Sequence, residues 1–151
     1  MRVLITGAGG SIGSEFCRQI VKLDPARITL LDSSEFNLFS IDHELAKLAP
    51  NVSRVTALCC IRNNDAVARW FARERPQIVF HVAALKQVPL LEDHASEGVL
   101  TNVLGTRNVA RAVRAAGAHM VLVSTDKAVS PRSTMGATKR MAELYCQALD
   151  V

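Results

Sequence analysis

The sequence of 151 residues predicts an α/β fold, in which helices cover both faces of a doubly wound parallel sheet of five strands. Short apolar segments alternate with longer segments of helical periodicity along the whole chain, and no internal repeat or low-complexity stretch interrupts them. The first apolar segment runs directly into a glycine-rich turn. This alternation is typical of parallel sheets, because each parallel pair of strands needs a crossover between them.

Three strands and three helices are predicted in the first half of the chain. The strands, which are short and rich in aliphatic residues, are Arg2–Thr6, 27–31 and 52–58. The helices, which place apolar residues at helical spacing, cover 12–23, 38–48 and 67–71. Each helical pattern ends before a residue that cannot continue a helix, namely Pro25, Pro50 or Pro76.

The second half of the chain continues the alternation. Residues 78–82 predict a buried fourth strand, and residues 99–113 predict a long helix that Gly117 closes. Residues 120–123 predict the fifth strand, and a final helix is expected over Thr134–Leu149. Five strands in this order predict right-handed crossovers that place helices on both faces.

Composition and charge exclude several classes of protein. Hydrophobic residues make up 49% of the chain, and no apolar run reaches the roughly 18 residues that a membrane span needs. The net charge is +4, but basic residues are scattered and only 5% of residues are aromatic, so no nucleic-acid partner is expected. The cysteines lack metal-ligand spacing and are expected to be reduced thiols of a cytoplasmic protein without a metal site: Cys17, Cys59, Cys60 and Cys146.

The turn after the first strand has the pattern T-G-x-x-G-x-x-G over residues 6–13. Between a strand and an amphipathic helix, this pattern is typical of Rossmann-type dinucleotide-binding domains. Its first glycine permits a tight turn, its second lets the backbone approach a pyrophosphate, and its third allows close helix packing. The alternative is a turn kept only for packing. The residues expected to hold the phosphates, in part through N–H groups at the helix start, are Gly7, Gly10, Ser11, Ile12 and Gly13.

Asp32 ends the second predicted strand, 19 residues after Gly13. An acid at this position can bond the adenosine ribose hydroxyls and would repel a 2′-phosphate, so NAD is expected in preference to NADP. The alternative is that Asp32 caps the helix that follows it.

Four later segments resemble nucleotide-sugar 4,6-dehydratases of the capsular-polysaccharide type, which are extended short-chain dehydrogenases/reductases. The segments are HVAALKQVPL over 81–90, TNVLGTRNV over 101–109, STDKAV over 124–129 and MGATKR over 135–140. The resemblance covers nearly the whole chain, and the combination of the last two segments is specific. It implies an NAD-dependent lyase that acts on a UDP-sugar such as UDP-N-acetylglucosamine in bacterial polysaccharide biosynthesis.

The resemblance also implies roles for residues near the fifth strand. Asp126 would be the acid for the departing 6-hydroxyl, Lys127 the base at C5, and Lys139 the partner of the nicotinamide ribose. A lysine can act as a base only if burial or a nearby positive charge, such as Lys139, lowers its pKa. The alternative is a loop salt bridge between Asp126 and Lys127, with Met135 as a core side chain.

Met135 departs from the Tyr-x-x-x-Lys pattern of most short-chain dehydrogenases. A thioether cannot exchange a proton with the substrate, although a branch of the dehydratases shares this methionine. The 4-hydroxyl proton would then leave through Thr125, Asp126 or a water.

A second departure lies at Cys59 and Cys60, where the family usually has a glycine–aspartate pair whose aspartate contacts the adenine. Adenine affinity is therefore in doubt, whereas pyrophosphate binding is not. His81 is interpreted as a packed histidine. Ala83 is expected to contact the cofactor, and Lys86 and Asn102 the substrate. Lys86 could reach a sugar-nucleotide phosphate or could be a surface charge. Asn102 resembles the helix asparagine of the dehydrogenase active site, although it could equally cap or kink its helix.

Two rival functions share this scaffold, namely a nucleotide-sugar 4-epimerase and a non-catalytic NAD-binding or assembly module. The segment Thr125–Asp126–Lys127 favours the dehydratase, because an epimerase needs no acid for a leaving 6-hydroxyl.

Residues 1–151 are expected to be a truncated dinucleotide-binding domain without its substrate-binding part, and to form a homodimer through 99–116 and Thr134–Leu149. Long members of the family carry a membrane-embedded half, so the parent protein would lie in the cytoplasm or on the cytoplasmic face of the inner membrane.

Overall fold

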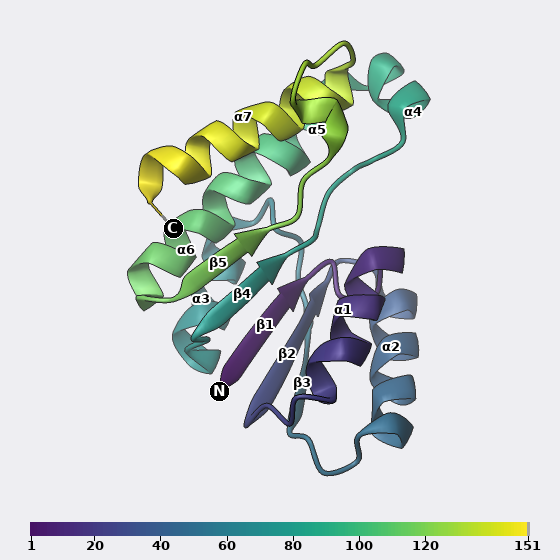
Figure 1. Ribbon diagram of the computed structural model, residues 1–151, viewed down its shortest axis with the longest axis vertical. Coiled ribbons are helices and arrows are strands. Elements are labelled where there is room, and N and C mark those ends of the chain that lie inside the picture. Colours follow the sequence, from purple (N-terminus) through teal and green to yellow (C-terminus); the bar gives the residue numbers. More distant parts are fainter. Residues whose placement is uncertain (151) are drawn as a thin grey trace.

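The computed structural model describes residues 1–150 and contains one parallel sheet between two layers of helices (Figure 1). The spatial order of the strands is β3-β2-β1-β4-β5, so the order reverses between β1 and β4. The strands are β1 (Arg2–Thr6), β2 (Arg27–Asp32), β3 (Arg54–Leu58), β4 (Ile78–His81) and β5 (His119–Leu122). The predicted Rossmann-type sheet is confirmed, and its switch point, where such folds bind ligands, lies beside the glycine turn.

The helices cover the two faces of the sheet unequally (Figure 1). One face packs against α1 (Ser11–Val21) and α2 (Glu35–Leu48). The other face packs against α3 (Asn64–Glu74) and α6 (Thr106–Ala116), and α7 (Thr134–Leu149) lies along α6. This arrangement places the start of α1 and the start of α7 at the same edge of the sheet.

The central strands are apolar on both faces because both faces are covered. In β1, Val3 and Ile5 are buried against the α1–α2 layer, whereas Leu4 is buried against the α3–α6 layer. Ile28 and Leu30 of β2 continue the first cluster. Such unbroken apolar runs are typical of parallel strands that are buried on both sides.

The region before α6 differs from the prediction. The helix predicted from residue 99 is present, but its first part is a π-helical segment, η1 (Val99–Gly105), that continues into α6. Two short helices that were not predicted, α4 (Val88–Asp93) and α5 (Ala95–Gly98), precede it. A side chain at Gly105 would collide with Ile61, since its Cβ would lie 2.6 Å from the Ile61 Cδ1 atom. The close approach of the turn after β3 therefore depends on this glycine.

The remaining differences are small shifts of strand and helix ends. The third strand begins at Arg54 and not at residue 52, while the fourth and fifth strands end one residue earlier than predicted. The first helix ends at Val21, because Lys22 and Leu23 already belong to the exposed turn. A 3₁₀ turn, η2 (Asp126–Ala128), follows β5. Within residues 1–150, no helix is both long enough and apolar enough to cross a membrane.

Candidate functional site

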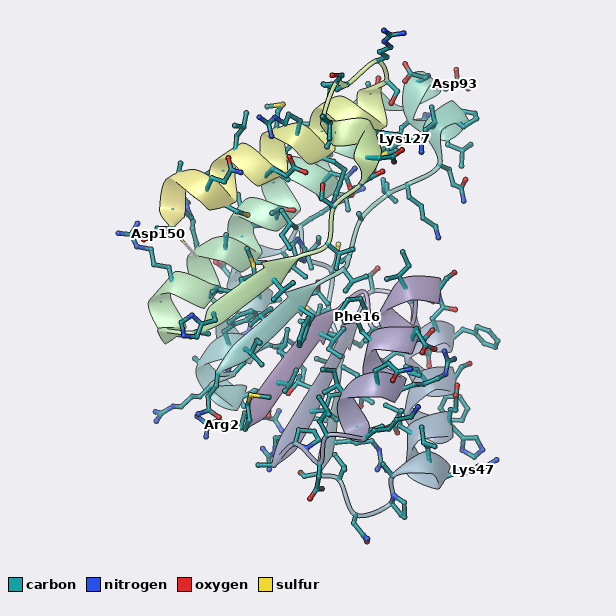
Figure 2. The ribbon with its side chains drawn as sticks, viewed as in Figure 1. Arg2, Phe16, Lys47, Asp93, Lys127 and Asp150 are labelled. Carbon is teal, nitrogen blue, oxygen red and sulfur yellow. The ribbon has the colours of Figure 1, made fainter. Side chains whose placement is uncertain are left out.

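A cleft of about 800 Å³ opens at the carboxyl ends of the strands. The glycine turn, the segments after β2, β3, β4 and β5, and the first turns of α7 form its walls. In Figure 2 Lys127 lies at this edge of the sheet, whereas Arg2 lies at the opposite edge. The cleft brings together all the predicted site residues except Asp126 and Asn102: Gly7, Gly10, Ser11, Ile12, Gly13, Asp32, Ala83, Lys86, Thr125, Lys127, Met135 and Lys139.

The glycine turn has a shape that side chains would prevent. Gly7 has a φ of +67°, and a Cβ atom there would lie 2.7 Å from the Ala83 Cα atom. A Cβ atom at Gly13 would collide with the Gly7 carbonyl oxygen. The turn is closed by the Gly10 N–H, which donates to that same oxygen at 3.1 Å. These contacts bring the start of α1 against the end of β1. The glycines place no side chain between the backbone of the turn and the cleft.

The N-terminus of α1 faces the cleft without a capping side chain. Gly10 is its N-cap and supplies no side-chain hydrogen bond, whereas α2, α3 and α7 are capped by Ser34, Asn63 and Ser133. The first N–H groups of a helix have no partner within the helix, and they carry its positive dipole end. The predicted phosphate contacts at Ser11 and the following residues therefore fit this geometry.

Asp32 presents its carboxylate at the wall of the cleft. One oxygen accepts from the Gly9 N–H at 2.9 Å, and the other accepts from the Ser34 N–H at 2.9 Å. The cap of α2 is Ser34, whose hydroxyl accepts from the Asn37 N–H at 3.3 Å, so the alternative that Asp32 caps this helix is wrong. The carboxylate is instead fixed between the glycine turn and the end of β2.

The segment after β5 carries the predicted acid and base on the open side of the cleft. The Thr125 hydroxyl donates to the Asp126 carboxylate at 3.0 Å, and the Lys127 ammonium lies 3.6 Å from the same carboxylate oxygen. The hydrogen bond from Thr125 and the charge of Lys127 hold the pKa of Asp126 below its usual range. The side chains of Lys127 and Asp126 are 56% and 88% exposed. The predicted alternative, a loop salt bridge, is thus present, and residues 1–150 do not bury the lysine.

Met135 and Lys139 lie one turn apart on α7 and are 5% and 6% exposed. The Lys139 ammonium donates to the Val123 carbonyl oxygen at 2.7 Å, which ties α7 to the end of β5. Burial lowers the pKa of Lys139, and the nearby Glu143 carboxylate opposes that shift. Both side chains line the cleft, so Met135 is more than a core side chain.

His81 is a packed histidine, as predicted, and its ring joins three elements. Its Nδ1 atom lies 2.6 Å from the Thr6 hydroxyl, and its Nε2 atom lies 2.9 Å from the Thr106 hydroxyl. The Thr6 oxygen already accepts from the N–H groups of Val82 and Ala83, so its proton goes to Nδ1 and Nε2 carries the ring proton. Burial lowers the pKa of His81 to about 3. The neutral ring therefore holds the ends of β1 and β4 against α6.

Asn102 has a positioning role in the structure in place of the predicted substrate contact. Its side chain is 1% exposed and does not line the cleft. The amide oxygen accepts from the Leu85 N–H at 2.8 Å, and the amide nitrogen donates to the Leu85 carbonyl and to the Thr138 hydroxyl, both at 3.0 Å. Asn102 thus fixes the loop that carries Ala83 and Lys86 relative to α7.

Some residues that hold the site together were not predicted from the sequence. Ser124 donates a short hydrogen bond to Glu143, and Arg140 pairs with the same carboxylate at 3.0 Å. The spacing of Glu143, four residues after Lys139 on one helix, was the only available signal. The turn after β3 is held by Asn108, for which the sequence offers no signal because the two segments are distant in the chain.

The described residues contain no cluster of three or more His, Cys, Asp or Glu side chains that could hold a metal ion. The four cysteines are free thiols, and only Cys60 among them is exposed. Burial raises the pKa of Cys59, whose thiol points back to the Cys60 carbonyl oxygen at 3.6 Å.

Comparisons with known proteins cover almost the whole chain. Residues 3–151 match the family described as "Polysaccharide biosynthesis protein". The capsular polysaccharide biosynthesis protein CapD of Staphylococcus aureus is 43% identical over 150 residues, which are 98% of this chain and 25% of that protein. The UDP-glucose 4-epimerase of Rickettsia bellii (strain OSU 85-389) is 36% identical over 146 residues, which are 93% of this chain and 41% of that enzyme.

A solved structure shares the fold. The UDP-glucose-4-epimerase from Stenotrophomonas maltophila, determined with bound NAD and formylated UDP-arabinopyranose, superposes with a TM-score of 0.88 at 22% identity. The match covers 99% of this chain and 48% of that enzyme. The chain therefore spans between a quarter and about half of the length of these proteins.

Proposed function

The chain belongs to the polysaccharide biosynthesis protein family, and on this premise we propose that it is the NAD-binding domain of a nucleotide-sugar 4,6-dehydratase. The observation that carries the proposal is the position of the segment Thr125–Asp126–Lys127. It follows β5 at the mouth of the same cleft that the glycine turn opens, beside the buried Lys139. An acid and a base on one side of a dinucleotide cleft suit a reaction that removes both a hydroxyl group and a proton.

The fit of NAD to the cleft supports the cofactor assignment. The bare glycine turn and the uncapped start of α1 suit a pyrophosphate, and Asp32 suits a ribose without a 2′-phosphate. The S. maltophila enzyme of the same fold holds NAD. When bound, the nicotinamide would accept a hydride from sugar C4 and return it to C6.

The proposed roles of the protein groups are proton transfer and orientation. Lys139 would bond the nicotinamide ribose from its buried position on α7. Asp126, directly or through Thr125 or a water, would take the proton of the 4-hydroxyl group as the hydride leaves C4, and would donate that proton to the departing 6-hydroxyl. Lys127 would take the C5 proton and return it to C5 when the hydride returns to C6. Both side chains are exposed in residues 1–150, so these roles require that the bound sugar and the rest of the site exclude water around them.

The second candidate is a nucleotide-sugar 4-epimerase, which the name of the R. bellii relative favours. An epimerase transfers hydride at C4 without loss of the 6-hydroxyl, so it has no use for an acid at Asp126. A third candidate, a non-catalytic NAD-binding module, is favoured by Met135, because a methionine in the cleft wall cannot exchange a proton.

Incubation of the full-length protein with NAD and UDP-N-acetylglucosamine, followed by chromatographic separation of the epimeric nucleotide sugars and by mass spectrometry, separates these candidates. A dehydratase gives a product lighter by one water, whereas an epimerase gives an isobaric product. No change in either mass or configuration would favour the binding module. We further propose a UDP-sugar as the substrate and the cytoplasm, or the cytoplasmic face of the membrane, as the location of the parent protein.

A further inference from the structure

The turn after β3, residues 59–63, forms the end of the cleft where a cofactor base would lie. The Cys59 N–H donates to the Asp32 carbonyl oxygen at 2.8 Å, so this turn is a direct neighbour of the residue proposed to hold the adenosine ribose. Residues 59–62 all line the cleft. A dinucleotide with its ribose at Asp32 must therefore place its base against this turn.

The carbonyl groups of residues 60–62 in this turn are already engaged. The Cys60 carbonyl oxygen accepts from the Asn63 N–H at 3.0 Å. The carbonyl oxygens of Ile61 and Arg62 both accept from the Asn108 side-chain amide, at 3.0 and 3.1 Å. These bonds orient the carbonyl groups into the fold, toward α3 and α6, and away from a base in the cleft.

The side chains of the turn also lack a good acceptor. The exposed Cys60 thiol is only a weak one, and the Arg62 guanidinium can only donate and is paired with Glu97 at 2.6 Å and Thr101 at 2.8 Å. Of the described residues that line the cleft, only Asp32 and Asn37 carry a carboxylate or an amide. Asp32 has both oxygens on backbone N–H groups.

Asn37 packs against the glycine turn, where a Cβ atom on Gly9 would come within 2.5 Å of the Asn37 Cβ atom. An adenine placed on residues 59–62 would find no side-chain oxygen acceptor on that turn, because those residues are two cysteines, an isoleucine and an arginine.

We propose that Cys60 makes the base subsite tolerant at position 6, so that dinucleotides with adenine or with unsubstituted purine, which has a hydrogen in place of the 6-amino group, bind with similar affinity. A site that hydrogen-bonds a ligand group rejects the analogue without that group, because its own polar atoms are left unpaired. A thiol in that position loses little when the 6-amino group is replaced by a hydrogen. This inference rests on the proposed dinucleotide site and concerns only its selectivity for the base.

Calorimetry with NAD and with nicotinamide purine dinucleotide, in which unsubstituted purine replaces adenine, tests the inference on the unaltered chain. We expect dissociation constants within about threefold of each other, since the two bases differ only at the 6-amino group and no strong hydrogen bond to that group is expected. A preference for NAD of more than about tenfold, the ratio expected from a lost hydrogen bond, would overturn the inference and leave the dinucleotide site standing. Failure of both dinucleotides to bind at millimolar concentration would overturn the site itself, and the inference with it.

Two substitutions at the same exposed position sharpen the test. Cys60→Asp supplies an acceptor that bonds a 6-amino group and finds no partner on unsubstituted purine, so it should shift the ratio toward NAD by about tenfold or more. Cys60→Ala is the matched control, because it removes the thiol without adding an acceptor and so should create no preference. An unchanged ratio in Cys60→Asp, with an unfolding midpoint like that of the unaltered chain, would contradict the proposal.

Discussion

Asp32 directs its two carboxylate oxygens to the N–H groups of Gly9 and Ser34, which fixes a negative charge at the ribose end of the cleft. A 2′-phosphate placed there would be repelled, so the chain should bind NAD more tightly than NADP. Asp32→Asn keeps an oxygen that can accept from the glycine turn but removes the negative charge. It should therefore reduce the difference in affinity between NAD and NADP. Calorimetry measures both affinities, and equal affinities in the unaltered chain would refute the ribose assignment.

In the full-length enzyme, substitution of Met135 should have little effect on activity, whereas substitution of Asp126 or Lys127 should have a large one. The thioether of Met135 lines the cleft but can neither accept nor donate a proton, so Met135→Leu should keep most of the activity. Asp126→Asn and Lys127→Ala should lose about 10²–10⁴-fold in turnover, the usual effect of removing a general acid or base. Turnover of UDP-N-acetylglucosamine measures all three. A Leu variant as inactive as the Asn variant would show that the methionine has a role in the chemistry.

At the scale of elements, His81 links β4 to β1 through Thr6 and to α6 through Thr106. Its folded pKa of about 3 lies below the ordinary 6.5, so the unfolded chain binds this proton first as the pH falls. The stability that the neutral ring contributes is complete above pH 6.5 and is lost between 6.5 and 3. Between pH 7 and pH 5 this loss amounts to about 2 kcal/mol of unfolding free energy.

Urea unfolding at pH 7 and pH 5 measures that loss, and His81→Gln provides the control. Glutamine can bond two hydroxyl groups but does not titrate, so the variant should lose about 2 kcal/mol less than the unaltered chain over the same interval. Equal losses in the two proteins would mean that His81 is not the group that makes the fold sensitive to acid.

The elements that the sequence predicted well are those with a long periodic or apolar signal. All five strands and the helices α1, α2, α3, α6 and α7 were predicted, because their buried faces repeat at a fixed spacing. The short helices α4 and α5 were not predicted, since a segment of four to six residues has too few positions to show a period. The residues of η1 were predicted as the start of the helix that α6 completes, but their π-helical form was not. The path of this region is set by distant contacts, such as the hydrogen bond that the Leu85 N–H donates to Asn102.

The residues of the candidate site also divide into those that a local sequence pattern predicts and those that it does not. Glycines and charged residues in a known pattern, such as Gly7 and Lys139, were found from the sequence and do line the cleft. The role of Asn102 and the supports that Asn108 and Glu143 provide depend on which segments meet in space. No local pattern contains that information.

At the scale of the whole molecule, α6 and α7 form the face through which we propose that two copies associate. The exposed apolar side chains Met141 and Leu144 of α7 are 52% and 49% exposed. Three alanines of these helices, Ala110, Ala112 and Ala142, are buried within the chain, so the exposed apolar side chains must supply most of the contact. Exposed apolar patches of this kind often mark interfaces.

Sedimentation at tens of micromolar tests this association. The unaltered chain should sediment as a homodimer, and Leu144→Glu should sediment as a monomer because it would bury a charge in the interface. Phe39→Glu, at an exposed aromatic residue on α2 on the other side of the sheet, is the control and should leave the dimer intact. A monomeric unaltered chain would count against the proposed interface.

Residues 1–150 enclose the cofactor side of the cleft more fully than the sugar side. This difference predicts that the chain binds NAD but does not convert a nucleotide sugar. On the cofactor side, the glycine turn is closely packed and Lys139 is buried. On the sugar side, Asp126 and Lys127 are largely exposed, so no described residue covers the position where a sugar would react. The related proteins are also two to four times longer than the matched region, and we propose that the groups that grip the uridine diphosphate lie in their additional length.

Holding a substrate in place can lower a reaction barrier by roughly 7–11 kcal/mol. This chain should lack that contribution. With NAD and UDP-N-acetylglucosamine added together, calorimetry should therefore show NAD binding while mass spectrometry shows no product. Steady formation of a 4-keto-6-deoxy sugar by this chain alone would contradict the prediction, because the exposed Asp126 and Lys127 would then suffice for the reaction. Absence of NAD binding at millimolar concentration would instead contradict the proposed dinucleotide site itself.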